Sequence, residues 1–211
     1  MKTQGPISIA TLKRLPLYLS YLKALPKDGP LNISATSIAM ALDLNEVQVR
    51  KDLASVGDGG RPKIGYLTEE LISDLEDCLG CRDCHDAALV GAGNLGKALL
   101  CCGEFGRYGM EIAVAFDESE SNIGTTINNK HVLSADKLEE LCSRMKIRIG
   151  IITVPDYAAQ DVCDALVRAG VLAIWNFAPV KLKVPKGVVV LDEHIGSSLP
   201  VLLNHLAETI G

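Results

Sequence analysis

The residues best suited to chemistry form a glycine-rich segment, Gly91-Ala92-Gly93-Asn94-Leu95-Gly96, directly after the apolar run at residues 87–90. In a dinucleotide-binding turn the first glycine permits a tight turn, the second lets the backbone approach a pyrophosphate, and the third lets a helix pack closely on a strand. The N-terminus of the following helix offers unpaired N–H groups and partial positive charge to phosphates. The spacing therefore predicts a dinucleotide-binding loop; the alternative is a strand–helix turn that binds nothing.

An acid, Asp117, follows the next apolar run at residues 112–116. A carboxylate at that place bonds the ribose hydroxyls of a dinucleotide and repels a 2′-phosphate. The loop and the acid together favour NAD(H) over NADP(H) as the cofactor.

Two further polar segments follow apolar runs, namely Thr153-Val154-Pro155 and Asn176-Phe177-Ala178-Pro179. Ligands of parallel sheets bind at the carboxyl ends of the strands, so we expect both segments to contribute to the cofactor site. Position alone leaves a second interpretation equally open, because Pro155 suits the start of a helix and Asn176 suits a turn.

From residue 87 onward apolar runs alternate with helical patterns, which indicates an α/β fold with a parallel, Rossmann-like sheet. Leucines at helical spacing predict a C-terminal amphipathic helix over residues 198–210. The expected strands lie near residues 87–90, 112–116, 149–154, 171–175 and 188–191, and the expected helices near 135–146 and 156–169.

The first third of the chain has the pattern of a helix-turn-helix. Ser34 and Asn45 are N-cap residues by type, and a short turn separates the helices that they begin. Pro16 is expected in the first turn of its helix or at a kink. The expected helices lie over residues 11–25, 34–42, 46–53 and 68–78.

The N-terminal part of the chain is basic and the rest is acidic. Residues 1–66 contain nine lysines and arginines against five acids, and the remainder contains twelve against twenty-one, which gives the net charge of −5. The glycine-rich residues 57–66, with Arg61 and Lys63, predict a β-hairpin wing. A basic N-terminal part on an acidic remainder is typical of a protein that meets a polyanion such as DNA with one end only.

The composition, 48% hydrophobic and 22% charged, is that of an ordinary globular protein. No apolar run approaches the roughly 18 residues of a membrane span, and the first residues lack the pattern of a secretion signal. Seven cysteines, an odd number, make a poor disulfide framework and agree with a reducing compartment. We therefore expect a cytoplasmic protein without membrane contact.

Several of these segments together resemble the Rex family of redox-sensing repressors. The resemblance rests on Val49-Arg50-Lys51-Asp52-Leu53, Gly57, Gly60 to Tyr66, Gly91 to Gly96, Phe116-Asp117, Thr153 to Pro155 and Asn176 to Val180, and so covers nearly the whole chain. It implies a homodimer that exchanges its C-terminal helices, binds an inverted-repeat operator in double-stranded DNA when NADH is scarce, and releases it when NADH rises. The implied domains are a winged helix at 1–80, a Rossmann-like NAD(H) domain at 81–195 and a domain-swapped helix at 196–211.

The resemblance also implies roles for single residues. Gln48, Arg50 and Lys51 would meet the major groove, and Arg61 and Lys63 would enter the minor groove from the wing. Arginine can grip guanine with two hydrogen bonds, whereas lysine supplies a point charge. The alternative for the charged pair at 50–51 is a solvated helix face.

Two positions depart from the family's pattern. Cys102, which we place near the start of the nucleotide-domain helix, stands where many relatives have tyrosine, and Ser20 stands where some have arginine. In the family both positions are tied to switching contacts with an aspartate that matches Asp192. The sensing mechanism is therefore expected to differ in detail.

A group of cysteines precedes the first expected strand: Cys78, Cys81, Cys84 and the adjacent His85. The interpretations, in order of preference, are free thiols in a linker, a thiol switch and a metal site. We therefore expect no bound metal; if the chain did bind one, these four residues would be the candidate ligands. A regulator that senses redox state or metal through this group is one alternative function.

An NAD-dependent dehydrogenase is the other alternative function. The residues after Ala87 leave little room for a substrate domain beside a nucleotide fold. No proton donor and acceptor are placed for hydride chemistry, since Tyr157 is followed by Asp161 rather than by lysine. We therefore expect no enzyme activity.

Overall fold

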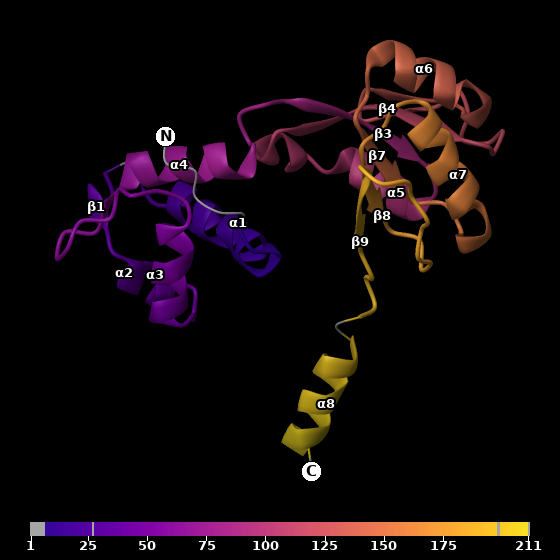
Figure 1. The fold of residues 1–211 in the computed structure, drawn as a ribbon. Helices are drawn as coiled ribbons and strands as arrows, with labels where there is room; N and C mark the ends of the chain where they lie inside the picture. The colour runs from indigo at the N-terminus through magenta and orange to yellow at the C-terminus, as the bar shows by residue number, and fades with distance from the viewer. Residues whose placement is uncertain (1–6, 27, 198, 211) are drawn as a thin grey trace. The chain divides into compact units, whose positions relative to one another are not determined.

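The computed structural model describes residues 7–26, 28–197 and 199–210. The chain divides into two compact units, residues 1–83 and 84–211, which are treated separately below (Figure 1). No helix among the described residues has the length and apolar character to cross a bilayer.

The first unit contains a helix-turn-helix, as the sequence predicts. The side chains of Ser34 and Asn45 cap helices α2 and α3 by accepting hydrogen bonds from the backbone N–H groups of Ser37 and Gln48. The elements of this unit are α1 (Ile9–Lys23), β1 (Asn32–Ile33), α2 (Ala35–Ala41), α3 (Glu46–Ala54), β2 (Tyr66–Leu67) and α4 (Thr68–Leu79).

The buried faces of these helices form one apolar core. Leu15, Tyr18 and Leu19 of α1 pack with Val49 and Leu53 of α3, all at most 2% exposed. The position of Pro16 differs from one expectation, because it lies in the middle of α1 and not in its first turn.

The wing differs from the expected hairpin. Residues 57–66 do not form two paired strands; Arg61 and Gly65 make a single bridge, and β2 pairs instead with β1. Gly65 has φ +89°, and a Cβ there would lie 2.3 Å from the carbonyl oxygen of Ile33. The pairing of β2 with β1 therefore requires glycine at position 65. A local sequence pattern could not predict this pairing, because the two strands are far apart in the chain.

The second unit is built on a sheet with the strand order β5-β6-β4-β3-β7-β8-β9. Each neighbouring pair is parallel except β5 with β6, and the order reverses direction between β3 and β7, as in dinucleotide-binding folds. The strands are β3 (His85–Val90), β4 (Met110–Asp117), β5 (Thr126–Ile127), β6 (Lys130–Ser134), β7 (Ile149–Ile152), β8 (Ala173–Asn176) and β9 (Val189–Asp192). The predicted α/β class is confirmed; β5 and β6 were not predicted.

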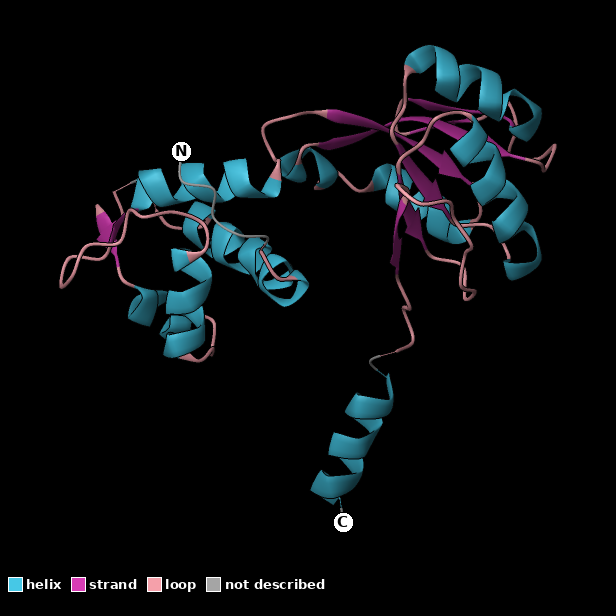
Figure 2. Cartoon of the chain, in the orientation of Figure 1, coloured by secondary structure: helices cyan, strands magenta, loops and turns pink. Residues whose placement is uncertain are grey.

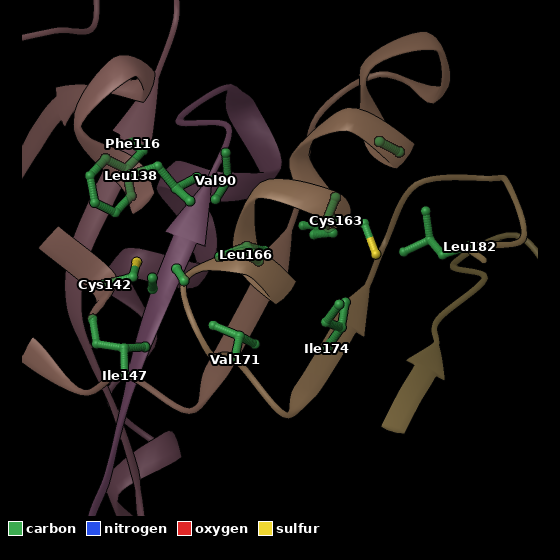
Figure 3. Close-up of a cluster of buried hydrophobic side chains, with 14 of the residues drawn as sticks. Val90, Phe116, Leu138, Cys142, Ile147, Cys163, Leu166, Val171, Ile174 and Leu182 are labelled. Carbon is green, nitrogen blue, oxygen red and sulfur yellow. The ribbon is translucent and has the colours of Figure 1, made fainter. Parts of the chain in front are cut away.

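Helices cover both faces of this sheet (Figure 2). Leu138, Cys142, Cys163 and Leu166 pack on one face, in the core drawn in Figure 3. Leu100 packs on the other face, with Leu89 of β3 among others. The helical elements are α5 (Asn94–Cys101), η1 (Phe105–Tyr108), η2 (Ala135–Lys137), α6 (Leu138–Met145), α7 (Asp156–Arg168) and α8 (Leu199–Ile210).

Helix α8 has an apolar stripe that is exposed among the described residues of the chain. Leu199, Val201, Leu202, Leu203 and Leu206 are each more than half exposed. Burying such side chains removes about 25 cal/mol of unfavourable free energy for each Å² of apolar surface. The helix thus has a strong tendency to pack against another apolar surface.

Candidate functional site

The glycine-rich loop connects β3 to α5 and needs two of its glycines for steric reasons. Gly91 has φ +102°, and a Cβ there would lie 2.9 Å from the backbone carbonyl of Thr153. A Cβ on Gly96 would lie 2.0 Å from the carbonyl oxygen of Gly91. The first glycine therefore permits the turn, and the third permits the approach of α5 to the strand.

Gly93 is different because its surroundings are open. A Cβ there would meet nothing within 4 Å, and the residue is the N-cap of α5. The backbone at the start of this helix is thus accessible to a ligand. An accessible helix N-terminus beside a tight glycine turn has the donors and the space that a pyrophosphate requires.

Asp117 ends β4 and faces this loop. Its carboxylate accepts hydrogen bonds from the backbone N–H of Ala92 (2.6 Å) and of Ser119 (2.7 Å), and from the amide of Asn122 (3.2 Å). The side chain therefore holds the loop in place. Two carboxylate oxygens offer about four acceptor positions, which leaves capacity for a ribose hydroxyl.

A cavity of about 440 Å³ lies at this edge of the sheet. Among the predicted cofactor residues it is lined by Gly91, Gly93, Asp117, Thr153, Val154 and Pro155. Sequence reasoning missed the other residues of its wall, which are Val90, Glu118, Asn122, Ala135, Ala158 and Val162. The glycine turn, the acid and an apolar wall together fit the pyrophosphate, ribose and adenine of a dinucleotide.

The remaining predicted cofactor residues do not line this cavity. Ala92, Asn94, Leu95 and Gly96 belong to the loop and helix beside it, and Asn176, Phe177, Ala178 and Pro179 follow β8. Thr153 donates its hydroxyl to the carbonyl oxygens of Gly91 (2.7 Å) and Val90 (3.0 Å). Its side chain thereby joins β7 to the glycine turn.

Asn176 is fully buried and organises the loop that follows it. Its amide nitrogen donates to the carbonyl oxygens of Val180 (2.9 Å) and Ala178 (3.3 Å), and to Oδ1 of Asp192 (2.8 Å). Its amide oxygen accepts from the N–H of Ala178 (3.0 Å). Within the chain, Asn176 thus acts as a turn former, which is one of the two interpretations that its position allowed.

Aromatic side chains flank this loop. The ring of Phe177 lies 4.7 Å from that of Trp175, and Phe105 meets Trp175 edge-on at 5.7 Å. The indole nitrogen of Trp175 is buried without a hydrogen-bond partner among the described residues. These contacts agree with a packing role for Trp175.

Three of the five predicted DNA-binding residues line a groove of about 540 Å³ in the first unit, whereas Gln48 and Lys51 are not among its lining residues. The start of α2, Arg50 of α3 and the wing residues Arg61 and Lys63 line it. Tyr66 forms part of its wall, and a Cβ on Gly60 would lie 2.8 Å from the Tyr66 ring. Three cationic side chains thus line one groove, a charge that suits a polyanion.

The polar side chains of α3 differ in whether they contact other residues of the protein. Arg50 pairs with Glu46 one turn away, and Lys51 is exposed to solvent. Gln48 donates its side-chain amide to Asp52 at 2.9 Å. The side-chain nitrogen of Gln48 is therefore hydrogen-bonded within the protein, whereas its side-chain oxygen accepts no hydrogen bond from the described residues.

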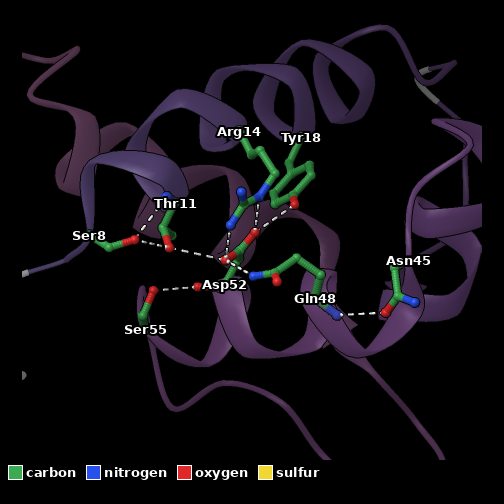
Figure 4. Close-up of polar contacts among 8 residues, drawn as sticks. All are labelled: Ser8, Thr11, Arg14, Tyr18, Asn45, Gln48, Asp52 and Ser55. Carbon is green, nitrogen blue, oxygen red and sulfur yellow. Dashed lines mark hydrogen bonds and ion pairs between the residues drawn. The ribbon is translucent and has the colours of Figure 1, made fainter.

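Asp52 is the main feature that sequence reasoning missed. It is 2% exposed and lies on the buried side of α3 (Figure 4). Its carboxylate accepts hydrogen bonds from Arg14 Nε (2.7 Å) and Nη2 (2.8 Å), and from the Tyr18 hydroxyl (2.8 Å). Thr11 donates its hydroxyl at 3.1 Å. The available signal was its position in the helix, between the core residues Val49 and Leu53.

The pKa values in this network follow from its contacts. Burial alone would raise the pKa of Asp52, but the hydrogen bonds, that from Arg14 above all, lower it to about 2. Burial and the hydrogen bond to Asp52 raise the pKa of Tyr18 to about 12, and the same carboxylate raises the pKa of Arg14. The carboxylate is thus ionised throughout the physiological range and ties α1 to α3.

The three switch candidates lie as follows. Asp192 ends β9, is exposed and accepts the hydrogen bond from Asn176. Ser20 is exposed on α1. Cys102 lies at the C-terminal end of α5 and not near its start, because that helix is only eight residues long.

The cysteine candidates do not form a metal centre in the described part of the chain. No three cysteine, histidine or acidic side chains are grouped to hold an ion there. Cys78 and Cys81 pack against the core of the first unit, and burial raises the pKa of both thiols. Cys84 and His85 are exposed at the start of the second unit. A thiol with a raised pKa is a poor redox switch.

Comparisons with known proteins point in one direction. Residues 83–180 match the CoA binding domain family, and residues 6–54 match a family described as putative DNA-binding protein N-terminus. The chain is 41% identical to the redox-sensing transcriptional repressor Rex of Porphyromonas gingivalis over 93% of this chain and 90% of that protein. It is 40% identical to Rex of Clostridium beijerinckii over 99% of both chains.

Solved structures agree. The chain superimposes with a TM-score of 0.90 on RSP in complex with β-NAD⁺ and operator DNA, at 35% identity over 97% of this chain and 94% of that chain. It superimposes with a TM-score of 0.87 on RSP in complex with β-NADH, at the same identity over 97% of this chain and 96% of that chain.

Proposed function

Because the chain belongs to the Rex family of redox-sensing transcriptional repressors, we propose that it binds an inverted-repeat operator when NADH is scarce and leaves it when NADH binds. The observation that carries this proposal is the presence, in one chain, of a cation-lined groove on a helix-turn-helix and a glycine loop beside an acid. The first suits DNA and the second suits a dinucleotide. Residues 1–80 would then read DNA, residues 81–195 bind NAD(H), and residues 196–211 form the helix exchanged within a homodimer.

In this proposal the groove of the first unit receives double-stranded DNA. Arg50 and Lys51, with Gln48, face the major groove, and Arg61 and Lys63 enter the minor groove. Contacts from these cations to phosphates displace counterions, which makes the affinity strongly dependent on salt. Base discrimination would come from Arg50, provided that it leaves Glu46 and takes up a guanine edge.

The cavity beside the glycine loop is the proposed cofactor site. The backbone of residues 91–96 would hold the pyrophosphate, and Asp117 would hold the ribose and exclude a 2′-phosphate. Thr153, Val154 and Pro155 also line the cavity, and the segment 176–179 lies at the same edge of the sheet. A bound nicotinamide would supply the redox signal through its oxidation state, and the residues of the chain would only hold the cofactor.

Switching requires that NADH bind more tightly to the arrangement that cannot bind DNA. A tenfold loss of operator affinity needs a coupling free energy of only about 1.4 kcal/mol. Asp192 is the switch candidate that retains the residue type of the family, whereas Ser20 and Cys102 do not. The protein would work in the cytoplasm, where both NADH and DNA are present.

The test is fluorescence anisotropy of a labelled inverted-repeat DNA with an AT-rich centre, at fixed salt, titrated with NADH, NAD⁺ or NADPH. Release by NADH, with weak or no response to NADPH, is the expected result. A scrambled duplex of equal composition and length is the control. The proposal fails if NADH leaves operator binding unchanged, or if the scrambled duplex binds equally well.

The two alternative functions have less support. The relatives that match along nearly the full chain are named as repressors, which speaks against a dehydrogenase. The raised thiol pKa values of Cys78 and Cys81 speak against these cysteines as the main sensor. Replacing Cys81 and Cys84 with serine should accordingly leave the response of operator binding to NADH unchanged.

A further inference from the structure

Two cysteines line a second hollow in the Rossmann-like unit. It has a volume of about 220 Å³ and lies between the start of β3 and the end of α5. Cys84 and Cys102 both line it, and Phe105 and Met110 supply apolar parts of its wall. We call it the thiol pocket.

The fold itself causes this juxtaposition. The chain rises along β3 to the glycine loop and returns along α5, so the end of the helix lies near the start of the strand. Two hydrogen bonds hold the surrounding wall: His85 N–H donates to the carbonyl oxygen of Gly109 (2.8 Å), and the Asn128 amide donates to that of Leu100 (2.9 Å). The walls of the thiol pocket are therefore held in place by the backbone of the Rossmann-like unit.

Exposure and position set these two cysteines apart from the other five. Cys142 and Cys163 are fully buried, and burial raises the pKa of each thiol to about 11. Cys78 and Cys81 belong to the other unit. Cys101 is exposed and adjacent to Cys102, yet it does not line the thiol pocket.

Both cysteines lie in irregular backbone. Cys84 precedes β3 and Cys102 follows α5, so neither lies within a helix or a strand. Gly103 comes next, and a Cβ there would meet nothing within 4 Å. A disulfide needs Cα atoms about 4.4–6.8 Å apart, so the proposed bond requires these two irregular segments to bring the cysteines into that range.

We propose that Cys84 and Cys102 form a reversible disulfide within one chain when the protein meets a hydroperoxide. One thiolate attacks the peroxide oxygen, which breaks the O–O bond, gives a sulfenic acid and, with a proton, releases water. The second thiolate attacks that sulfur, forms the S–S bond and displaces hydroxide, which takes up a proton as the second water. In total, two thiols and one hydrogen peroxide give one disulfide and two waters, and a dithiol reductant reverses the step.

Tryptic mapping of the full-length protein tests this. Cleavage after Arg82, Lys97 and Arg107 separates Cys84, in peptide 83–97, from Cys101 and Cys102, in peptide 98–107. After treatment with hydrogen peroxide and alkylation of the remaining thiols, we expect a disulfide-linked 83–97/98–107 species that dithiothreitol removes. On a non-reducing gel the oxidised protein should run as a single chain.

Variants identify the partner. Cys84→Ser and Cys102→Ser should abolish the linked species, whereas Cys101→Ser, the matched control, should retain it. Circular dichroism verifies that each variant is folded. The proposal is overturned if the wild type forms no linked species, if Cys102→Ser still forms it through Cys101, or if the bond joins two chains.

Discussion

Replacing Asp52 with asparagine would remove one charge from α3 with almost no change in volume. The carboxylate is stabilised by hydrogen bonds from Arg14, Tyr18, Thr11 and Gln48, which lower its pKa from 3.8 to about 2. Lowering the pKa from 3.8 to about 2, at 1.36 kcal/mol for each pKa unit, corresponds to roughly 2–2.5 kcal/mol of folding free energy. Loss of one partner from a fully buried ion pair costs about 3–5 kcal/mol. The Arg14 side chain is 26% exposed, so we expect a smaller cost for this pair, near the value obtained from the pKa of Asp52.

The sign of the pH dependence follows from the lowered pKa. A carboxylate with a depressed pKa in the folded state contributes stability above its unfolded pKa of 3.8, and this contribution is lost as the pH falls through about 2. Asp52→Asn should therefore be less stable than the wild type by about 2 kcal/mol near neutral pH. The difference should shrink as the pH approaches 2.

Guanidinium unfolding followed by far-UV circular dichroism measures this difference. Trp175, the single tryptophan, lies in the second unit, so its fluorescence follows that unit separately. Asp58→Asn, which changes an exposed acid of the first unit, is the matched control and should alter stability by less than about 0.5 kcal/mol. The reasoning is refuted if Asp52→Asn costs no more than the control, or if its cost is the same at about pH 2 and about pH 6.

Three further predictions concern the ligand sites. Gly96→Ala should weaken NADH binding at least tenfold in a calorimetric titration, because its Cβ would lie 2.0 Å from the Gly91 carbonyl oxygen; Gly103→Ala, whose Cβ meets nothing, should not. Arg61→Gln should reduce the slope of log affinity for operator DNA against log salt by about 1, whereas Arg144→Gln on α6 should leave it unchanged, and equal slopes would contradict the groove as the DNA site. Asp117→Ser should raise the affinity for NADPH relative to NADH at least tenfold, and an unchanged ratio would remove Asp117 from cofactor selection.

Local chemistry made much of the fold predictable. Ser34 and Asn45 begin helices as their types predict, because each supplies an oxygen to an otherwise unpaired backbone N–H. The glycine loop was predictable for the same kind of reason, since only glycine fits beside the Thr153 carbonyl at Gly91 and beside the Gly91 carbonyl at Gly96. The acid at position 117 ends its strand as expected.

Features that depend on distant partners were not predictable. The wing pairs Tyr66 with Ile33, and two-residue strands are too short to show a period. Asp52 resembles a surface charge in the sequence, because Arg14 and Tyr18 are more than thirty positions away. Cys102 was placed at the wrong end of its helix because nothing in the local pattern marks where α5 stops.

The amide of Asn176 has two hydrogens but three acceptors, at Val180, Ala178 and Asp192. All three bonds cannot be at full strength together, so the acceptors compete for the same donors. Asp192 stands at the end of the last strand, from which the chain continues towards α8. A new donor that engages the Asp192 carboxylate would let the amide turn fully to the carbonyls of its own loop. The loop after β8 and the segment leading to the C-terminal helix therefore share the Asn176 amide group. A stronger hydrogen bond from this amide to one of them weakens its hydrogen bond to the other.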